Sequence, residues 1–186
     1  MYSVTLYREN AFTLVELLVV VAILAILSSL AVPSYRDYME RSQLSSAVQK
    51  LYSTLMLAQA ESYKSKSTAR LCPLDLRVDK QLDNRQCESN IAKKVDWANG
   101  WILWLDRDNG GYADFDGMSE IVRVNQPNKH ISMIWNNNVQ PQYKSNGLGA
   151  QAGSFLFCSS SGKYAKKVVL NVIGRPHVME LPKGCS

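Results

Sequence analysis

One ionisable side chain in the first part of the chain lies inside an apolar run. Glu16 is the only charged residue between Phe12 and Val32. That run has the ~20 residues that a helix needs to cross a bilayer. A carboxylate in the middle of such a helix costs roughly 2.5–3.5 kcal/mol and normally has a partner. Glu16 lies near one end, which lowers the cost, and we expect it to pair with a cation.

A cut in the chain between Ala11 and Phe12 would supply that cation. It would create an α-amino group four residues before Glu16, on the same chain or on a neighbouring one. The attraction would be stronger than in water because the surroundings have a low dielectric constant. A polar pair at one depth also fixes register, as a single polar residue does in a coiled coil. The sequence therefore predicts an assembly function for Glu16 that depends on processing.

Two simpler interpretations of the apolar run remain open. Ser29-Leu30-Ala31 offers the small-x-small cleavage site of an ordinary signal peptide. A plain single-pass anchor is the other alternative. Neither accounts for Glu16, nor for a polar segment of eleven residues that ends in Ala11.

The four cysteines have no C-x-x-C spacing, which argues against zinc. In an exported chain they indicate two disulfides and an oxidising compartment. We favour Cys72–Cys87, whose loop of about 15 residues is worth roughly 3 kcal/mol, together with Cys158–Cys185. The second bond would hold the C-terminal tail against a strand. Crossed pairings and free buried thiols are the alternatives.

Catalytic and metal-binding patterns are weak. The acidic turn at residues 106–111 begins like a calcium loop, but Gly110 replaces the third ligand and Gly117 the closing glutamate. We therefore favour a solvated hairpin turn over calcium and expect no cofactor. His130 and His177 lack metal-ligand spacing, and no nucleophile elbow or phosphate-binding loop is present. The sequence argues against an enzyme.

A long helix must position Glu16. It should run from Phe12 to about Lys64, with a bend or local melting at Pro33. In its second half, apolar residues recur at i, i+3, i+4 and i+7, which predicts a stripe packed on a domain. The stripe comprises Leu44, Ala47, Val48, Leu51, Leu55 and Ala58. A helix half in lipid and half on a small domain predicts a ladle shape.

Beyond Ala69 the apolar residues alternate with a period of two, which predicts short antiparallel strands separated by turns. One long helix followed by such strands indicates the α+β class. The expected strands are 69–72, 101–105, 120–125, 130–135, 154–158, 167–173 and, less regularly, 177–181.

The segment AFTLVELLVVVAILAIL, after a short polar leader and before Pro33, resembles the signal of type IV pilins and type II secretion pseudopilins. The resemblance implies a leader at residues 1–11 and cleavage by a prepilin peptidase before Phe12, whose new amino group is methylated. It also implies that Glu16 is the assembly carboxylate and that Pro33 is the helix-kink position. Ala11 departs from the family, which usually has Gly before the cut.

The rest of the chain resembles the GspH/FimT-type domain of pseudopilins and minor pilins. The block Asp96-Trp97-Ala98-Asn99-Gly100-Trp101 and the late Gly174-Arg175 pair carry this similarity. The resemblance implies antiparallel sheets packed beside the second half of the helix. The expected boundaries are 12–33 for the membrane and assembly half-helix, 34–66 for the amphipathic half-helix and 67–186 for the β domain.

The chain carries a net charge of +5, and its last third is basic. After Glu120 there are eight Lys or Arg residues and one acid, Glu180. A basic face can hold a phosphate backbone without reading sequence. The DNA-binding pilins of the family carry a G-R-x-R motif, whereas here His177 replaces the second arginine. DNA is therefore a partner that we do not favour, and a solvated basic surface is the preferred interpretation. The candidate contacts are Arg175, Lys166, Lys167 and Lys183.

The two family resemblances together imply a minor pilin that helps to prime and cap a type IV pilus. Its expected partners are the prepilin peptidase, other minor pilins, the major pilin and the inner-membrane assembly platform. It would first lie in the inner membrane as a single-pass protein with its domain in the periplasm, and later at a pilus or pseudopilus tip. A type II secretion tip pseudopilin is the first alternative, and a DNA-binding pilin for natural transformation is the second.

Overall fold

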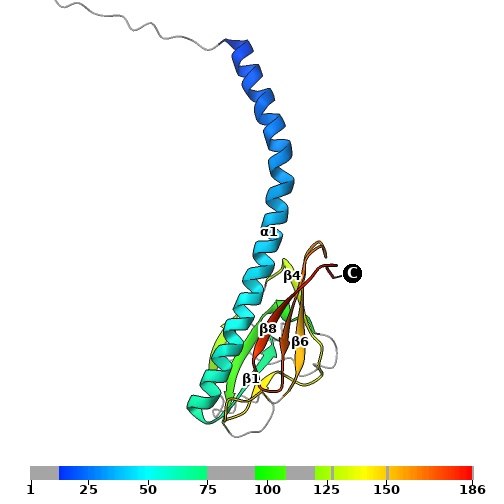
Figure 1. The fold of residues 1–186 in the computed structure, drawn as a ribbon. Coiled ribbons are helices and arrows are strands. Elements are labelled where there is room, and N and C mark those ends of the chain that lie inside the picture. Colours follow the sequence, from blue (N-terminus) through cyan, green and yellow to red (C-terminus); the bar gives the residue numbers. More distant parts are fainter. Residues whose placement is uncertain (1–12, 75–94, 108–119, 127, 150, 186) are drawn as a thin grey trace, which may run out of the picture. The chain divides into compact units, whose positions relative to one another are not determined.

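The computed structural model describes residues 13–74, 95–107, 120–126, 128–149 and 151–185. Contacts divide the chain into two compact units, Met1–Met39 and Glu40–Ser186, which we call the N-terminal unit and the globular unit. The helix α1 spans Leu14–Ser65 and contributes to both (Figure 1). It ends where Lys66 adopts a left-handed φ of 55°.

In the N-terminal unit, the apolar part of α1 is long and hydrophobic enough to cross a membrane. Its mean hydropathy over the most apolar window is 2.7, and none of that window is buried. Pro33 lies inside the helix, which continues on both sides of it. Of the bend or local melting predicted at Pro33, local melting does not occur, and the bend stays a prediction. A proline removes one hydrogen bond, and the intact turns on either side are enough to keep the backbone helical here.

The part of α1 in the globular unit buries the predicted stripe. Leu51, Leu55 and Ala58 are completely buried, and Leu44, Ala47 and Val48 nearly so. Gln49 and Lys50 between them are exposed. The 3.6-residue period of the apolar positions therefore gave the correct face of the helix.

Two antiparallel four-stranded sheets complete the globular unit, so the α+β prediction is confirmed (Figure 1). The first sheet has the order β3-β2-β1-β5 and the second β4-β6-β7-β8. The first comprises β1 (Thr68–Pro73), β2 (Trp101–Asp106), β3 (Glu120–Asn125) and β5 (Gln142–Tyr143). The second comprises β4 (Ile131–Trp135), β6 (Gly153–Ser159), β7 (Ala165–Leu170) and β8 (Pro176–Leu181).

One hydrophobic core joins the helix stripe to both sheets. At its centre the Phe155 ring meets Trp97 edge-on at 5.0 Å and Trp135 at 4.5 Å. Such aromatic pairs stabilise a core beyond the area they bury. A smaller buried cluster of Cys72, Ile102 and Trp104 forms separately from this core.

Two strand predictions need correction. The expected strand at 167–173 begins earlier, at Ala165, and ends at Leu170. Asn171 to Gly174 form a turn instead: the Gly174 N–H donates to the Asn171 carbonyl at 2.9 Å, and Gly174 has a φ of 79°. The short strand β5 was not predicted, because two residues show no alternation. It exists because it pairs with Ala69 and Arg70 of β1.

Candidate assembly site and interaction surfaces

The Glu16 carboxylate caps the start of its own helix. Its Oε2 accepts hydrogen bonds from the Thr13 N–H at 2.9 Å and from the Thr13 hydroxyl at 3.0 Å. The Thr13 hydroxyl accepts one from the Glu16 N–H at 3.3 Å. This reciprocal arrangement is a capping box, which satisfies backbone donors at a helix start. The T-x-x-E spacing carried this signal, and our sequence interpretation missed Thr13.

The predicted cleavage pair, Ala11 and Phe12, lies outside the described residues. The α-amino group of Phe12, which would pair with Glu16 after cleavage, therefore also lies outside the described residues. The carboxylate lies in the first turn of α1, where the exposed apolar segment begins. The hydrogen bond that this carboxylate accepts from Thr13 is exposed.

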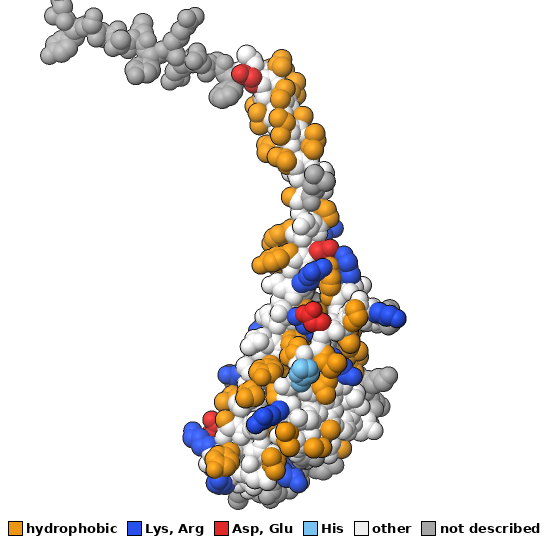
Figure 2. Space-filling view, viewed as in Figure 1, with side chains coloured by type: hydrophobic (Ala, Val, Ile, Leu, Met, Phe, Trp, Pro, Cys, Tyr) orange, Lys and Arg blue, Asp and Glu red, His pale blue; other side chains and the backbone are white. Residues whose placement is uncertain are grey.

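Large apolar side chains surround the N-terminal half of α1, as Figure 2 shows on one face. Leu14 is 75% exposed and Val15 67%, and the following Leu, Val and Ile side chains remain more than half exposed as far as Leu27. A helix that is apolar all round is stable only in lipid or against other helices. This segment can therefore insert in a membrane or pack into a bundle of similar helices.

The Cys158–Cys185 disulfide is present, with Cα atoms 5.8 Å apart. It joins the end of β6 to the C-terminal tail, as predicted. The Cys185 N–H also donates to the Gly162 carbonyl at 3.0 Å, so the tail is held against the β6–β7 turn. Cys72 is disulfide-bonded as well, but its expected partner Cys87 lies outside the described residues.

The four candidate DNA contacts do not converge on one site. Lys166 and Lys167 are adjacent on β7, so their side chains point to opposite faces of the sheet. The Lys166 ammonium lies 3.1 Å from the Glu180 carboxylate. Arg175 precedes β8 and Lys183 follows it, and a strand of this length separates its ends by roughly 20 Å.

The turn before Arg175 is a packed corner. The buried Tyr143 hydroxyl donates to the Gly174 carbonyl at 2.7 Å. A Cβ at Gly174 would lie 2.5 Å from the Tyr143 ring, so only glycine fits this approach. Burial raises the pKa of the Tyr143 hydroxyl above its ordinary value of 10.0. The Gly174-Arg175 pair thus has a structural basis that does not require a ligand.

The Asp96–Trp101 block also has a structural basis. Asp96 Oδ1 accepts hydrogen bonds from the Ala98 N–H at 2.9 Å and the Met133 N–H at 2.8 Å. It therefore caps the 3-10 turn η2 (Trp97–Asn99) and ties that turn to β4. Trp97 is then buried against Phe155.

Asp106 does not support the calcium alternative. It is buried at the end of β2, and its Oδ2 accepts a 2.7 Å hydrogen bond from Arg70 Nε. An arginine beside the carboxylate competes with any cation. Residues 108–119, the rest of that loop, lie outside the described residues. Within the described part of the chain, no group of three or more metal-ligating side chains could hold an ion.

An exposed apolar half-helix, a stripe packed on two sheets and an acid in the first turn define a pilin-like protein. The sequence pattern "Prokaryotic N-terminal methylation motif" matches residues 6–32. The family "Type II transport protein GspH" matches residues 47–174, which is more than half of the chain. The chain therefore belongs to the GspH family, and it is a structural protein of the pilin class rather than an enzyme.

Solved structures agree on the fold. The type IV minor pilin FimU of Pseudomonas aeruginosa aligns with a TM-score of 0.52 and 15% identity, over 80% of this chain and 99% of that one. At this identity the similarity concerns the fold alone.

Among curated relatives, the type IV major fimbrial protein FimA of Dichelobacter nodosus is 50% identical over 109 residues, 59% of this chain and 54% of that relative. A fimbrial protein of Pseudomonas aeruginosa is 35% identical over 72 residues, 38% of this chain and 47% of that relative. The chain spans about half, or less, of the length of the curated relatives it matches.

Proposed function

We propose that this chain is a minor pilin precursor. Residues 1–11 are a leader that a prepilin peptidase removes, and Phe12 becomes the methylated first residue. The precursor lies in the inner membrane with the globular unit in the periplasm. It then enters a type IV pilus with other minor pilins and the major pilin, through the assembly platform, and helps to prime and cap the filament.

The observation that carries this proposal is the first turn of α1. An acid stands there at the end of an apolar surface that has no partner among the described residues. Burying that surface between helices would be strongly favourable, but it would leave the carboxylate in a medium of low dielectric constant. The α-amino group freed at Phe12 would neutralise it. The methylation-motif match over residues 6–32 supports this order of events.

Mass mapping of the N-terminus tests the proposal. The full chain, produced in cells that contain a prepilin peptidase, should begin at methylated Phe12. In cells lacking that peptidase it should begin at Met1, and the Glu16→Ala variant should still be cleaved. A mature chain that begins at Val32, after the Ser29-Leu30-Ala31 sequence, would identify an ordinary signal peptide and end the pilin assignment.

A second candidate function is the tip pseudopilin of type II secretion. The name of the matched family, Type II transport protein GspH, favours it directly. Deletion of the gene separates the two functions. Loss of surface pili with normal exoprotein secretion supports the pilus function. The reverse result supports secretion.

DNA capture for natural transformation is the least supported function, because the basic residues are dispersed. A gel shift with the full chain in neutral detergent, compared with Arg175→Ala, is the direct test. We expect no retardation at about 0.15 M salt, because at most one or two phosphate contacts form at a time. Retardation that Arg175→Ala abolishes would reverse this ranking.

A further inference from the structure

A pocket of about 510 Å³ opens on the globular unit where α1, the β6–β7 turn and the end of β8 meet. Arg41 and Leu44 of the helix form one wall. Lys163, Tyr164 and Lys166 form the second, and Leu181 belongs to the third. The cations stand beside the apolar side chains of Leu181 and Pro182, so the pocket is suited to an anion attached to an apolar body.

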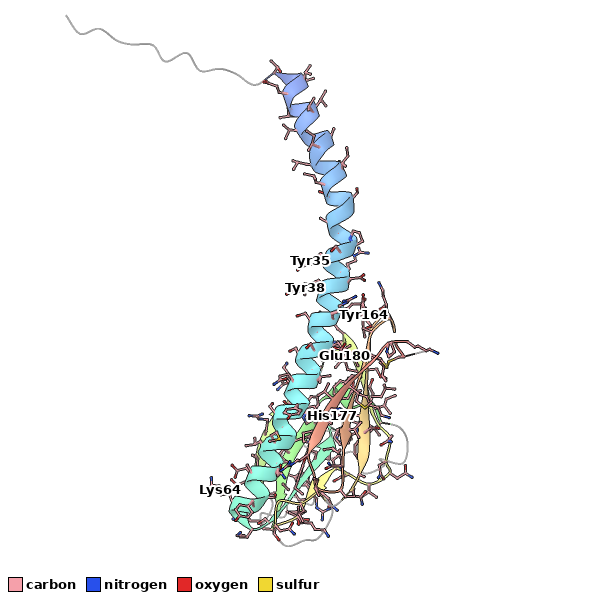
Figure 3. The ribbon with its side chains drawn as sticks, viewed as in Figure 1. Tyr35, Tyr38, Lys64, Tyr164, His177 and Glu180 are labelled. Carbon is pink, nitrogen blue, oxygen red and sulfur yellow. A yellow bond between two sulfur atoms is a disulfide. The ribbon has the colours of Figure 1, made fainter. Side chains whose placement is uncertain are left out.

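Two cations converge on one aromatic ring in this pocket. The Arg41 guanidinium carbon lies 4.5 Å from the centre of the Tyr164 ring, and its Nη2 donates to the Tyr164 hydroxyl at 3.2 Å. The Lys163 ammonium lies 5.3 Å from the centre of the same ring. Figure 3 shows Tyr164 beside α1. A guanidinium stacked in this way is oriented before a ligand arrives, and its planar fork matches a phosphate.

The local charge is positive. Arg41, Lys163 and Lys166 line the pocket, and Lys183 follows its third wall. Two acids offset part of this charge. Glu180, labelled in Figure 3, pairs with Lys166 at 3.1 Å, and Glu40 accepts a hydrogen bond from the Ser161 hydroxyl. Three cations and one acid, Glu180, line the pocket itself, and this lining favours an anion over a neutral or zwitterionic group.

The walls of the pocket are fixed in place. The Cys158–Cys185 disulfide and the Cys185–Gly162 hydrogen bond hold the tail against the turn that carries Lys163. The Ser159 N–H donates to the Tyr164 carbonyl at 2.9 Å, which closes the turn. The pocket therefore requires little ordering when a ligand binds, which lowers the cost of binding.

Nine positions of chain connect this pocket to the apolar segment. Arg41 follows Val32, the last residue of the apolar run, and a chain of that length spans at most about 30 Å even when fully extended. Between them, Tyr35 is 64% and Tyr38 66% exposed, and Figure 3 shows both side chains pointing away from the helix. Tyrosines are typical of the interface between membrane and water.

We propose that this pocket binds the phosphate of an anionic phospholipid while the precursor is in the membrane. The inference rests on the membrane-inserted state proposed above and adds a lipid ligand to it. Arg41 and Lys163 contact the phosphate oxygens, and Leu181 and Pro182 contact the apolar part of the lipid. Basic pockets of this kind near a membrane are typical headgroup sites.

Native mass spectrometry of the full chain in neutral detergent tests this proposal. Phosphatidylglycerol should be retained at roughly tenfold lower concentration than phosphatidylcholine. Arg41→Gln/Lys163→Gln should remove that preference. Lys50→Gln/Lys144→Gln, which removes the same charge from exposed positions outside the pocket, should keep it. Lys163→Gln alone, in an exposed turn, should lose part of the preference for phosphatidylglycerol. This single variant replaces the double variant in the test if the double variant fails to form its disulfide.

The other results overturn the proposal. Equal lipid preference in the double variant and the wild type would show that the pocket is not the site. Inorganic phosphate that binds as well as the lipid and displaces it would show a free-phosphate site with no membrane ligand. Neither result affects N-terminal processing, which mass mapping measures separately as a mature chain that begins at Phe12. Failure of the lipid proposal is therefore distinct from failure of the pilin assignment.

Discussion

The Glu16 carboxylate accepts a 2.9 Å hydrogen bond from the Thr13 N–H, and the Thr13 hydroxyl accepts a 3.3 Å hydrogen bond from the Glu16 N–H. The same side chain is therefore available for two functions. In the single chain it caps a helix, and in an assembly its charge would meet an amine. The two functions differ in what they require, because a cap needs an oxygen acceptor whereas the pairing needs a negative charge.

Substitution by glutamine should separate these functions. Glu16→Gln keeps an oxygen acceptor for Thr13 but removes the charge, and we expect at least tenfold less incorporation into filaments, measured by immunoblot of sheared pili. Thr13→Ala weakens the cap by about 1 kcal/mol and leaves the charge, so incorporation should stay close to wild type. Normal incorporation of Glu16→Gln would contradict the electrostatic explanation.

Asp96 should be important for the stability of the globular unit. Asp96→Ala leaves the Ala98 and Met133 N–H groups without their acceptor, which should cost about 2 kcal/mol of unfolding free energy. Asp96→Asn keeps an acceptor oxygen and should lose much less. Denaturant unfolding of the full chain in neutral detergent measures both. Equal losses for the two variants would show that charge, rather than hydrogen bonding, matters at this position.

Removal of the Cys158–Cys185 bond should lower stability by about 3–4 kcal/mol, since it closes a loop of 27 residues. For a unit of this size the melting temperature should fall by about 10 °C. The matched comparison is Cys158→Ser/Cys185→Ser against wild type without reductant, because a reductant would also act on Cys72. A melting temperature within about 2 °C of wild type would mean that the β6–β7 turn holds the tail without the bond.

Tyr143 should make stability depend on alkaline pH. Its folded-state pKa is raised by burial, so its contribution is complete below about pH 10 and decreases as the pH rises further. Tyr143→Phe should cost about 1 kcal/mol at neutral pH, because the Gly174 carbonyl loses its donor, and should weaken the alkaline decrease. Tyr63→Phe, at an exposed position, is the control for the other tyrosines. Parallel pH curves for wild type and Tyr143→Phe would refute this account.

The sequence predicted those parts of the fold that regular patterns determine. The stripe from Leu44 to Ala58 repeats with the period of a helix, and its burial is confirmed. The strand β4 alternates between buried and half-buried residues, whereas β2 is an apolar run that is buried throughout. Val172 and Ile173 misled the prediction because they are β-branched and apolar, yet they lie exposed in a turn. These two residues have a high strand propensity, but the Asn171–Gly174 turn forms there instead, because the Tyr143 hydroxyl donates a hydrogen bond to the Gly174 carbonyl and stabilises the turn.

The candidate site was only partly predictable, for a different reason. The length and the lack of other charges identified the apolar segment and its acid, but not the hydrogen bonds between Thr13 and Glu16. The pocket beside Tyr164 gathers residues more than a hundred positions apart, such as Arg41 and Lys163. No local pattern joins them, because the packing of α1 on the sheets brings Arg41 beside the β6–β7 turn.

The boundary between Met39 and Glu40 separates an exposed apolar helix segment from a unit with its own buried core. Among the described residues, the hydrophobic core begins at Leu44 and takes nothing from the apolar segment before it. The apolar segment can therefore adapt to the thickness of a bilayer or to neighbouring helices, and the free energy of unfolding of the β sheets would not change. A fragment that starts near Glu40 would retain the whole core and suit crystallisation in water.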